Sequence, residues 1–433
     1  MRARVRDASG FSRERILFLG EGVTLAHIVR LKVLAQSLDP RRYEVWFATS
    51  HFDPMIFAGT GFHCRKIDCM APTRMVRRIA GGRRPYDQAT LHRYVSEDLT
   101  LLETVQPALV VGDFRLSLAV SAPKAGVPYA ALINAYWSPA AVRDGFPIPE
   151  HPLIDFIGFD RVKPHFAKAL PFVFDHFARP VNALRKAYGL PPIGSLLEVL
   201  TFGDVTLYPD VPELTPVAER LPNHYFIGPV LWAPRAPLPW FWDRLRPDRP
   251  CIYVTLGSSG DLRALDAVIE AVDGLRVEVI VSTAGRPVTG KIPDNVWVSD
   301  FVPGDLAARR SDLVICNGGS ATGYQALHEG VPVLGLPSNL DQYLAMTAIE
   351  RTGAGELLRA GGADSASVRA AIERMLGSGG HRQAAQRAKA ALRSMDPLEM
   401  FPAIVRRTVG GPRDSEESAR PRNARCIEDQ QGP

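Results

Sequence analysis

A short polar turn after an apolar run has the residue types best suited to chemistry. Residues 313–316 are apolar and have the length of a buried strand. The run is followed by Asn317-Gly318-Gly319-Ser320-Ala321-Thr322. Glycine lets a ligand approach the backbone, and the free N–H groups and dipole of a helix N-terminus attract phosphate. The turn therefore predicts a phosphate site with added hydroxyl donors, although any strand-to-helix turn can use such residues as a cap.

The residues downstream extend this turn into a longer pattern. They are Gly330-Val331-Pro332, then Pro337, then Asp341-Gln342. With Gly318, Gly319 and Thr322, the pattern resembles the C-terminal signature of glycosyltransferase family 1, which reads roughly His-Gly-Gly-x-Gly-Thr-x-x-Glu, Gly-Val-Pro, Pro and Asp-Gln. The family includes plant UDP-glycosyltransferases and bacterial macrolide and glycopeptide transferases. The resemblance implies an α/β protein of GT-B architecture, with two doubly wound Rossmann-like domains facing each other across a cleft.

The same resemblance implies a set of donor-binding residues in the C-terminal half. Gly257 and Ser258 resemble a phosphate-contacting turn, and Phe301 and Val302 resemble the segment that stacks on the nucleobase. In the family, the Gly-Gly turn binds the diphosphate and the Asp-Gln pair bonds sugar hydroxyls. The full implied set is Gly257, Ser258, Phe301, Val302, Asn317, Gly318, Gly319, Ser320, Ala321, Thr322, Gln325, Asp341 and Gln342.

Two residues depart from the family pattern. Asn317 stands where a phosphate-contacting His is usual, and Gln325 stands where many members have a Glu that binds ribose hydroxyls. Asn can donate a neutral hydrogen bond but cannot become cationic. Gln bonds a hydroxyl less strongly than a carboxylate does. These departures leave open which nucleotide the donor carries, and they support a non-catalytic nucleotide-sugar-binding homologue as an alternative.

His27 and Asp113 are the candidate catalytic residues. His27 begins a predicted helix after an apolar strand, and its surroundings resemble the family's Gly-His-x-x-Pro motif, with Ala26 and Arg30 in place of Gly and Pro. Asp113 ends another predicted strand and resembles the family's acidic partner. Inverting transfer needs a base that takes the acceptor proton and an acid that orients the imidazole. We therefore expect a His27–Asp113 pair at the strand ends of the N-terminal sheet.

No Asp-x-Asp triplet occurs in the sequence. Such a triplet is what a GT-A enzyme uses to hold a divalent cation on the diphosphate. We expect no metal and no cofactor beyond the substrate nucleotide sugar, UDP- or dTDP-linked. Helix dipole, amides and hydroxyls would then stabilise the leaving group.

Alternating elements position these residues. In the N-terminal half, residues 15–20, 43–48, 108–113 and 129–133 read as strands, and residues 26–38 and 116–125 read as helices. Strand-helix-strand order at this spacing predicts a parallel sheet. Residues 138–192 are rich in Pro, Phe and His and have weak periodicity, which is typical of either a substrate cleft or surface packing.

The second half repeats this organisation. Prolines recur over residues 229–250, which we interpret as an interdomain linker. Strands are expected at 251–256, 277–282, 296–298, 313–316 and 331–336. The predicted domains are an N-terminal acceptor domain (14–228), the linker (229–250), a C-terminal donor domain (251–395) and a final helix (396–409). We expect disorder in a lead-in (1–13) and a polar tail (410–433).

Composition places the chain among globular proteins. It has 433 residues, 46% of them hydrophobic and 22% charged, with a net charge of +5. Five scattered cysteines without a CxxC pair argue against a disulfide framework or a metal site. Neither a signal peptide nor an apolar stretch long enough for a membrane span is recognised. We expect a cytoplasmic protein.

The expected partners are a nucleotide-sugar donor and a small, largely apolar acceptor, with no nucleic acid. One local cluster of basic residues suggests a further partner. It consists of the arginines at 74, 77, 78, 83 and 84. They read as a solvated loop or as a weak peripheral contact with an anionic membrane. A MurG-like transferase that acts on a lipid-linked acceptor at the membrane is therefore the other alternative to an inverting, metal-independent hexosyltransferase.

Overall fold

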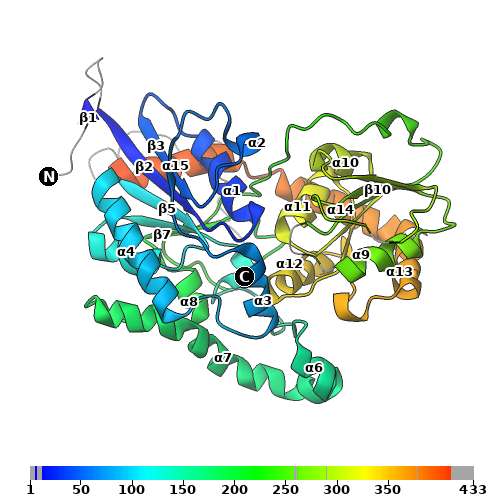
Figure 1. The fold of residues 1–433 in the computed structure, drawn as a ribbon, viewed down its shortest axis with the longest axis horizontal. Coiled ribbons are helices and arrows are strands. Elements are labelled where there is room, and N and C mark those ends of the chain that lie inside the picture. The colour runs from blue at the N-terminus through cyan, green and yellow to red at the C-terminus, as the bar shows by residue number, and fades with distance from the viewer. Residues whose placement is uncertain are drawn as a thin grey trace, which may run out of the picture.

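The computed structural model describes residues 5–6, 12–257, 260, 262–288, 290–377 and 379–410. Residues 1–4 and 7–11 of the expected lead-in, residues 411–433 of the expected tail, and Ser258 lie outside these residues. Figure 1 shows two α/β domains side by side, and each contains its own sheet. The likeness to a GT-B architecture expected from the sequence is confirmed by these two parallel-sheet domains.

The N-terminal sheet has the strand order β4-β3-β2-β5-β6-β7-β8, and these strands are parallel. A short β1 (Val5–Arg6) pairs antiparallel with β2. The strands are β2 (Ser12–Gly20), β3 (Tyr43–Thr49), β4 (His63–Lys66), β5 (Leu109–Asp113), β6 (Tyr129–Leu132), β7 (Val205–Tyr208) and β8 (His224–Phe226). Strand β5 is buried along its whole length because helices cover both faces of the sheet.

Two sets of helices cover that sheet. Alternate strand residues face an apolar layer shared with α1 (Leu25–Gln36) and α15 (Pro397–Gly410), and the opposite residues face α4 (Gln88–Val105) and α5 (Leu118–Ala125). The remaining helices of this half are α2 (Pro54–Phe57), α3 (Pro72–Ala80), η1 (Ala135–Trp137), α6 (Pro152–Ile157), α7 (Phe159–Ala187) and α8 (Leu196–Leu200).

The C-terminal sheet is wholly parallel, with the order β11-β10-β9-β12-β13-β14. Its strands are β9 (Cys251–Thr255), β10 (Glu278–Ser282), β11 (Val296–Ser299), β12 (Leu313–Cys316), β13 (Val333–Gly335) and β14 (Gly355–Leu357). One face packs on α9 (Leu262–Ala271) and α13 (Ser365–Gly377). The other packs on α10 (Gly304–Arg310), α11 (Ser320–Glu329), α12 (Leu340–Arg351) and α14 (Gly379–Leu392).

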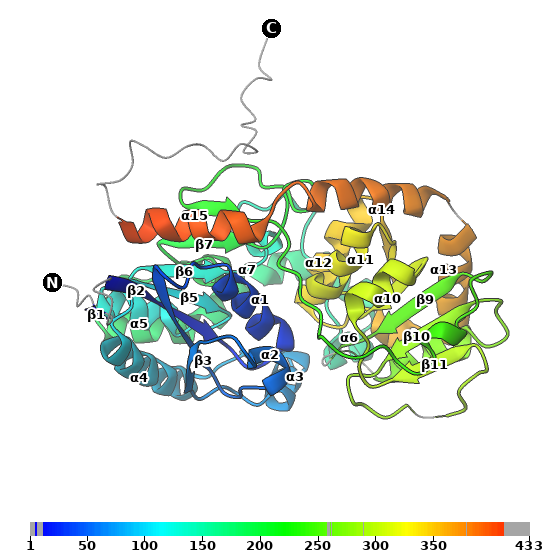
Figure 2. The same cartoon turned by 90° about the horizontal axis from the view of Figure 1, so that it is seen from above.

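The polypeptide passes between the domains twice, and the two connecting segments contact each other. The first leaves β8 through Gly228, whose φ is +83°, and enters the Pro-rich stretch, where the short helix η2 (Trp242–Arg244) lies. The second runs from α14 to α15, so that the C-terminal helix packs on the N-terminal sheet (Figure 2). A Cβ at Gly228 would lie 2.6 Å from the Met395 carbonyl oxygen, which leaves room only for glycine.

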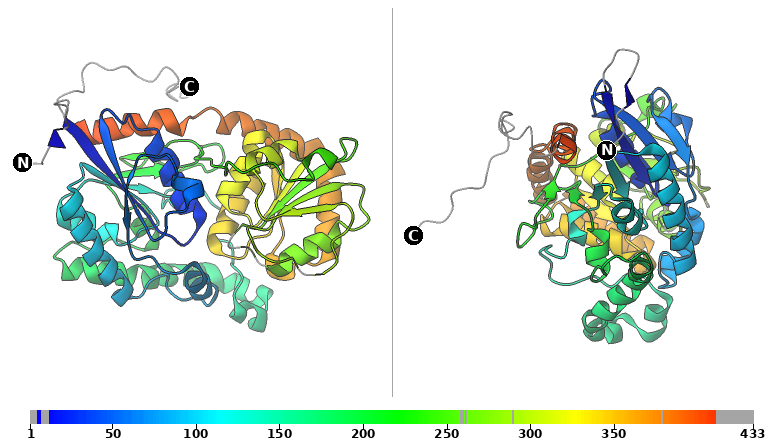
Figure 3. Two further views of the ribbon diagram at one scale, coloured as in Figure 1. Left: turned by 45° about the horizontal axis from the view of Figure 1, so that its top comes forward. Right: turned by 90° about the vertical axis from the view of Figure 1, so that its left-hand side faces the viewer.

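The segment that had weak periodicity in the sequence is mostly one helix. α7 spans 29 residues and contains Pro164, Pro171 and Pro180. It runs along the lower side of the N-terminal domain in Figure 3 and packs on α4, α5 and α8. None of the helices in the described part of the chain is both long enough and apolar enough to cross a bilayer.

We predict that α15 is an integral part of the N-terminal core. Phe401 is fully buried, and its ring lies 6.0 Å from that of Phe18 in β2. Phe401→Ala should lower the free energy of unfolding by about 3–5 kcal/mol. Leu398→Ala, on the exposed side of the same helix, should change it by less than about 0.5 kcal/mol. Urea unfolding followed by tryptophan fluorescence measures both, and equal effects would show that α15 is not docked in this way.

Candidate active site

The candidate residues lie at the point in each sheet where the strand order reverses. In the N-terminal sheet, β2 and β5 are neighbours, but the helices that follow them, α1 and α5, lie on opposite faces of the sheet. At the carboxyl ends of these strands, Gly20 pairs with Asp113. In the C-terminal sheet, β9 and β12 have the same relation, and Thr255 pairs with Cys316. Such switch points leave a crevice in which α/β proteins bind ligands. The predicted base and the predicted donor turn thus lie at equivalent places in the two domains.

His27 and Asp113 are joined by a hydrogen bond. The His27 Nδ1 lies 2.8 Å from the Asp113 Oδ1. A carboxylate only accepts, so Nδ1 carries the proton and Nε2 offers a lone pair. The Asp113 side chain is fully buried, whereas 18% of the His27 side chain remains exposed. The imidazole stacks on Phe114, with ring centroids 5.2 Å apart. The pair therefore has the geometry of a base held in one tautomer by a buried carboxylate.

Arg30 forms the other half of this arrangement. Its Nε and one terminal nitrogen donate to both oxygens of Asp113, at 3.0 and 2.9 Å. Burial alone lowers the pKa of a guanidinium, but the Asp113 carboxylate reverses this and raises the pKa of Arg30 above its ordinary value. Arg30 lies one helical turn after His27, so α1 presents both side chains to the same carboxylate.

A network of hydrogen bonds between side chains continues from Arg30 into the C-terminal domain. The other terminal nitrogen of Arg30 donates to the Asn134 side-chain oxygen at 2.8 Å, and the Asn134 amide donates to Asp210 at 2.9 Å. Asp210 also accepts from the hydroxyl of Tyr324 in α11. Burial raises the pKa of Asp210, although the donors from Tyr324, the Ala135 N–H and Asn134 oppose the shift. The network thus links the His27–Asp113 pair to α11, the helix that follows the predicted donor turn.

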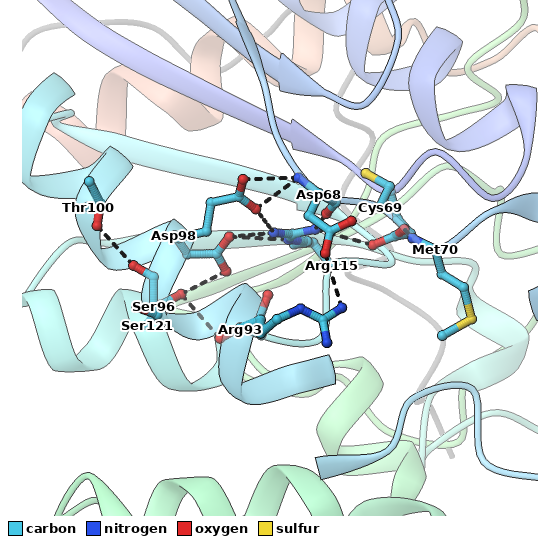
Figure 4. Close-up of polar contacts among 12 residues, drawn as sticks. Asp68, Cys69, Met70, Arg93, Ser96, Asp98, Thr100, Arg115 and Ser121 are labelled. Atoms are coloured by element: carbon cyan, nitrogen blue, oxygen red, sulfur yellow. Dashed lines mark hydrogen bonds and ion pairs between the residues drawn. The ribbon is translucent and has the colours of Figure 1, made fainter. Parts of the chain in front are cut away.

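The turn after Asp113 is held by a second buried cluster, shown in Figure 4. Arg115 donates to Asp98 at 2.9 Å and to the Asp68 carbonyl at 2.6 Å, and its guanidinium lies 3.9 Å from the centre of the Tyr94 ring. Glu21, which follows β2, lies 3.4 Å from Arg115; burial raises its pKa to about 7 even though Arg115 lowers it. Arg115 therefore fixes the segment from which Phe114, at φ 56°, reaches His27.

The donor turn has two glycines with different reasons for being there. Gly318 has a φ of +79°, and a Cβ there would lie 2.7 Å from Met346, so the position excludes other residues. Gly319 has an ordinary φ of −69° and would bring its Cβ no closer than 3.3 Å to Asn317. Its backbone tolerates a side chain, so the glycine keeps the space above the helix N-terminus open. Asn317 accepts from the Gly319 N–H at 3.1 Å and so shapes the turn.

The other predicted donor residues surround this turn to different degrees. Gly257 follows β9, and Arg286 donates to its carbonyl at 2.6 Å. Phe301 is half exposed, whereas the side chain of Val302 is buried in the apolar core. Gln325 donates to the Trp232 carbonyl at 3.4 Å.

Ser320, Ala321 and Thr322 form the first turn of α11. Ser320 also contacts the N-terminal domain, because its hydroxyl lies 3.4 Å from the Asn134 oxygen. The N-cap residue of α11, Gly319, has no side chain to bond the first amides of the helix.

The Asp341-Gln342 pair is divided between two tasks. Gln342 is buried and completes a capping box with Asn339 at the start of α12. Asp341 is exposed, and one of its oxygens accepts from the Trp137 indole at 2.8 Å and from the Tyr136 hydroxyl at 3.1 Å. Gln342 thus fixes the helix end in this structure, while Asp341 presents a carboxylate whose orientation the N-terminal domain sets.

Sequence reasoning missed the side chains that connect these parts. They are Asn134, Tyr136, Trp137, Asp210 and Tyr324. Asn134 and Asp210 follow the strands β6 and β7, so a rule that inspects every strand end would have found them. Among the described residues, no group of three or more His, Cys, Asp or Glu side chains is placed to hold a metal ion.

Known proteins resemble this chain in sequence and in fold. Residues 265–406 match the family model for the erythromycin biosynthesis protein CIII-like C-terminal domain. The chain is 47% identical over 376 residues to a PGL/p-HBAD biosynthesis glycosyltransferase of Mycobacterium tuberculosis, which covers 87% of this chain and 88% of that protein. It is 46% identical over 376 residues to a PGL/p-HBAD biosynthesis rhamnosyltransferase of Mycobacterium bovis, with 87% and 83% covered.

A solved structure, spinosyn rhamnosyltransferase SpnG complexed with thymidine diphosphate, superposes with a TM-score of 0.63. It covers 90% of this chain and all of that one at 20% sequence identity, so it supports the fold. The chain is thus similar to sugar transferases over nearly its whole length.

We predict that Arg30 and Asp113 depend on each other for stability. Arg30→Met leaves a buried carboxylate without its main counter-charge, and it should lower the free energy of unfolding by about 3–5 kcal/mol. Arg30→Met combined with Asp113→Leu should recover part of that loss because neither charge remains buried alone.

The matched control is Arg41→Met, which breaks the exposed Arg41–Asp39 pair and should leave stability unchanged. Chemical denaturation at pH 7 measures these three variants and Asp113→Leu alone. A double variant that is as unstable as the sum of its single changes would contradict the coupling.

Proposed function

The chain belongs to glycosyltransferase family 1, and within that family we propose that it is an inverting, metal-independent transferase. It is a glycosyltransferase; the proposal concerns which reaction it performs. We propose that it moves a hexose or deoxyhexose from a UDP- or dTDP-sugar to the hydroxyl of a small, largely apolar acceptor. The His27–Asp113 hydrogen bond at the N-terminal switch point is the observation that carries this proposal.

The chemistry follows from the tautomer of His27. Its Nε2 takes the proton of the acceptor hydroxyl as the acceptor oxygen attacks the anomeric carbon of the sugar. The bond from that carbon to the diphosphate oxygen breaks, and the nucleoside diphosphate leaves with the electron pair. Asp113 stabilises the imidazolium that forms. A single displacement of this kind inverts the configuration at the anomeric carbon.

In this proposal, the first turn of α11 stabilises the nucleoside diphosphate that leaves. Its amides and dipole favour negative charge, and Gly319 leaves the approach to them open. This is a fixed arrangement that needs no reorganisation as charge develops, which is the condition for effective electrostatic catalysis. No bound cation is required for it.

The nature of both substrates is supported by chemistry and by relatives. A relative 46% identical over most of the chain is named a rhamnosyltransferase, which favours a deoxyhexose, and SpnG is complexed with thymidine diphosphate. On the acceptor side, Phe114 stacks on the base and packs against a large apolar cluster that includes Tyr86 and Trp137. An acceptor with an aromatic or aliphatic body suits such surroundings.

Similarity to proteins named as inactive supports the non-catalytic alternative. An inactive PGL/p-HBAD biosynthesis glycosyltransferase of Mycobacterium bovis is 45% identical over 260 residues, or 60% of this chain. The relatives that cover 87% of the chain are named as transferases, and the base retains its buried partner here. The alternative is therefore not favoured.

We predict a selective loss of turnover when the base is removed. His27→Ala should lower kcat by a factor of roughly 10²–10⁴ and leave the affinity for the nucleotide sugar nearly unchanged. His92→Ala, on the exposed side of α4, is the matched control and should behave as wild type. Steady-state kinetics with donor binding by calorimetry separates the two effects.

An equal loss of donor affinity and kcat would instead make His27 a donor-binding or structural residue. Asp113→Asn should also lower kcat, but it leaves Arg30 buried without a counter-charge. Its activity must therefore be measured well below its melting temperature.

We predict that a free nucleoside diphosphate stabilises the protein. At about 100 times its Kd, dTDP or UDP should add about 2.7 kcal/mol of stability, because it binds only the folded site. Gly319→Leu should abolish the shift without unfolding the protein, since its backbone conformation accepts a side chain. Thr322→Val should reduce the shift, whereas Thr408→Val in α15 should not.

Thermal unfolding with and without nucleotide measures these shifts. Failure of both free nucleotide and sugar nucleotide to raise the melting temperature at millimolar concentration would rule out this donor site.

A further inference from the structure

We propose that one face of the N-terminal domain, formed by α3, α6 and α7, docks on an anionic lipid bilayer. We call this face the α3–α7 surface; it comprises residues 72–84 and the exposed side chains of residues 156–179. The docking itself does not depend on the reaction proposed above. Its use, which is to bring the base to an acceptor carried in the membrane, does rest on that reaction.

The first observation is the concentration of exposed apolar side chains. Phe156 at the end of α6 is 87% exposed, and Phe172 in the middle of α7 is 76% exposed. Large apolar residues are rarely left so open unless they contact something. The others on this face that are at least one-third exposed are Val76, Ile79, Ile157, Phe159 and Val173.

The second observation is the charge around these residues. α3 contains three arginines and no acidic residue, and only Met75 of its residues is buried. Among the residues that the structure describes, Arg74, Arg77 and Arg83 take part in no ion pair, although the interior arginines 30 and 115 do. Unpaired arginines beside exposed apolar side chains are the pattern that anionic lipid headgroups attract.

Contacts show that the three helices form one face. Arg84, in the loop after α3, bonds His176 of α7 at 3.0 Å. Phe172 lies one turn before His176 and Lys168 one turn before that, so all three occupy one stripe of α7. α6 packs directly on α7. In Figure 1, α3, α6 and α7 lie along the lower side of the molecule.

The surface is close to the candidate base. Met75 of α3 is fully buried in the same apolar cluster as Tyr86. The Tyr86 ring lies 6.3 Å from that of Phe114, which in turn stacks on His27. Few layers of side chains therefore separate the basic, apolar face from the imidazole, and an acceptor held at a bilayer surface would lie on the correct side of the molecule.

The test is co-sedimentation of the purified full-length protein with two kinds of vesicle. Vesicles of phosphatidylcholine with phosphatidylglycerol should bind the protein at low salt and release it at high salt, and vesicles of phosphatidylcholine alone should bind it poorly. Arg74→Ala with Arg77→Ala should weaken binding about 30-fold, or about fivefold for each arginine. Phe172→Ser should weaken it as well, because it removes insertion into the interface.

Matched controls use exposed residues elsewhere. Arg41→Ala with Arg276→Ala, and Trp240→Ser, should leave vesicle binding unchanged. His27→Ala should bind vesicles normally, and the surface variants should retain the thermal shift with nucleoside diphosphate, so docking and catalysis can fail separately.

Absence of binding to the anionic vesicles at low salt would overturn the proposal. Equal loss in the control variants would also overturn it. Binding to heparin that exceeds vesicle binding and ignores Phe172→Ser would assign the surface to a polyanion instead.

Discussion

The buried ion pair between Asp113 and Arg30 is the interaction on which the candidate active site depends. Asp113 lies at the end of a fully buried strand, where an unpaired charge would be strongly unfavourable. Arg30 balances the charge with two hydrogen bonds, and His27 takes the remaining place on one oxygen. One helix supplies both partners, so the docking of α1 on the sheet determines the orientation of the imidazole. His27 is positioned by the same contacts that make the buried carboxylate tolerable in the core.

This arrangement also ties the two domains together. Arg30 is committed to Asp113 and Asn134, Asn134 to Asp210, and Asp210 to Tyr324 of the opposite domain. Charged and polar groups that are removed from water must find partners, and here the last partner, Tyr324, lies in the other domain. The position of α11, and with it the glycine turn before it, is therefore related directly to the position of His27.

Much of the fold was predictable because it rests on periodic patterns. The strands expected at residues 43–48, 251–256 and 313–316 agree with β3, β9 and β12 to within a residue at each end. α7 was not predictable in the same way, since three internal prolines remove helical hydrogen bonds and disturb the apolar pattern. Packing on α4, α5 and α8 stabilises it in spite of those prolines.

The two halves of the site differ in how much of them the sequence reveals. The donor turn depends on backbone geometry, so its glycines and helix start form a contiguous motif that can be read directly. The acceptor side is built from single side chains at the ends of β5, β6 and β7, which are far apart in the chain. The family resemblance singled out His27 and Asp113. It marked Arg30 only as a residue that differs from the family's proline, and it did not indicate what Arg30 contacts.

That replacement has a physical meaning once the contacts are known. Proline could neither pair with Asp113 nor donate to Asn134, so Arg30 supplies both the counter-charge of Asp113 and the first link of the polar network that reaches the other domain. The phosphate contacts proposed for the Gly318-Gly319 turn differ in kind, because they use backbone amides. The N-terminal part of the candidate site instead rests on the side chains of Arg30, Asn134 and Asp210, so a substitution at one of them also disturbs the hydrogen bonds of the next.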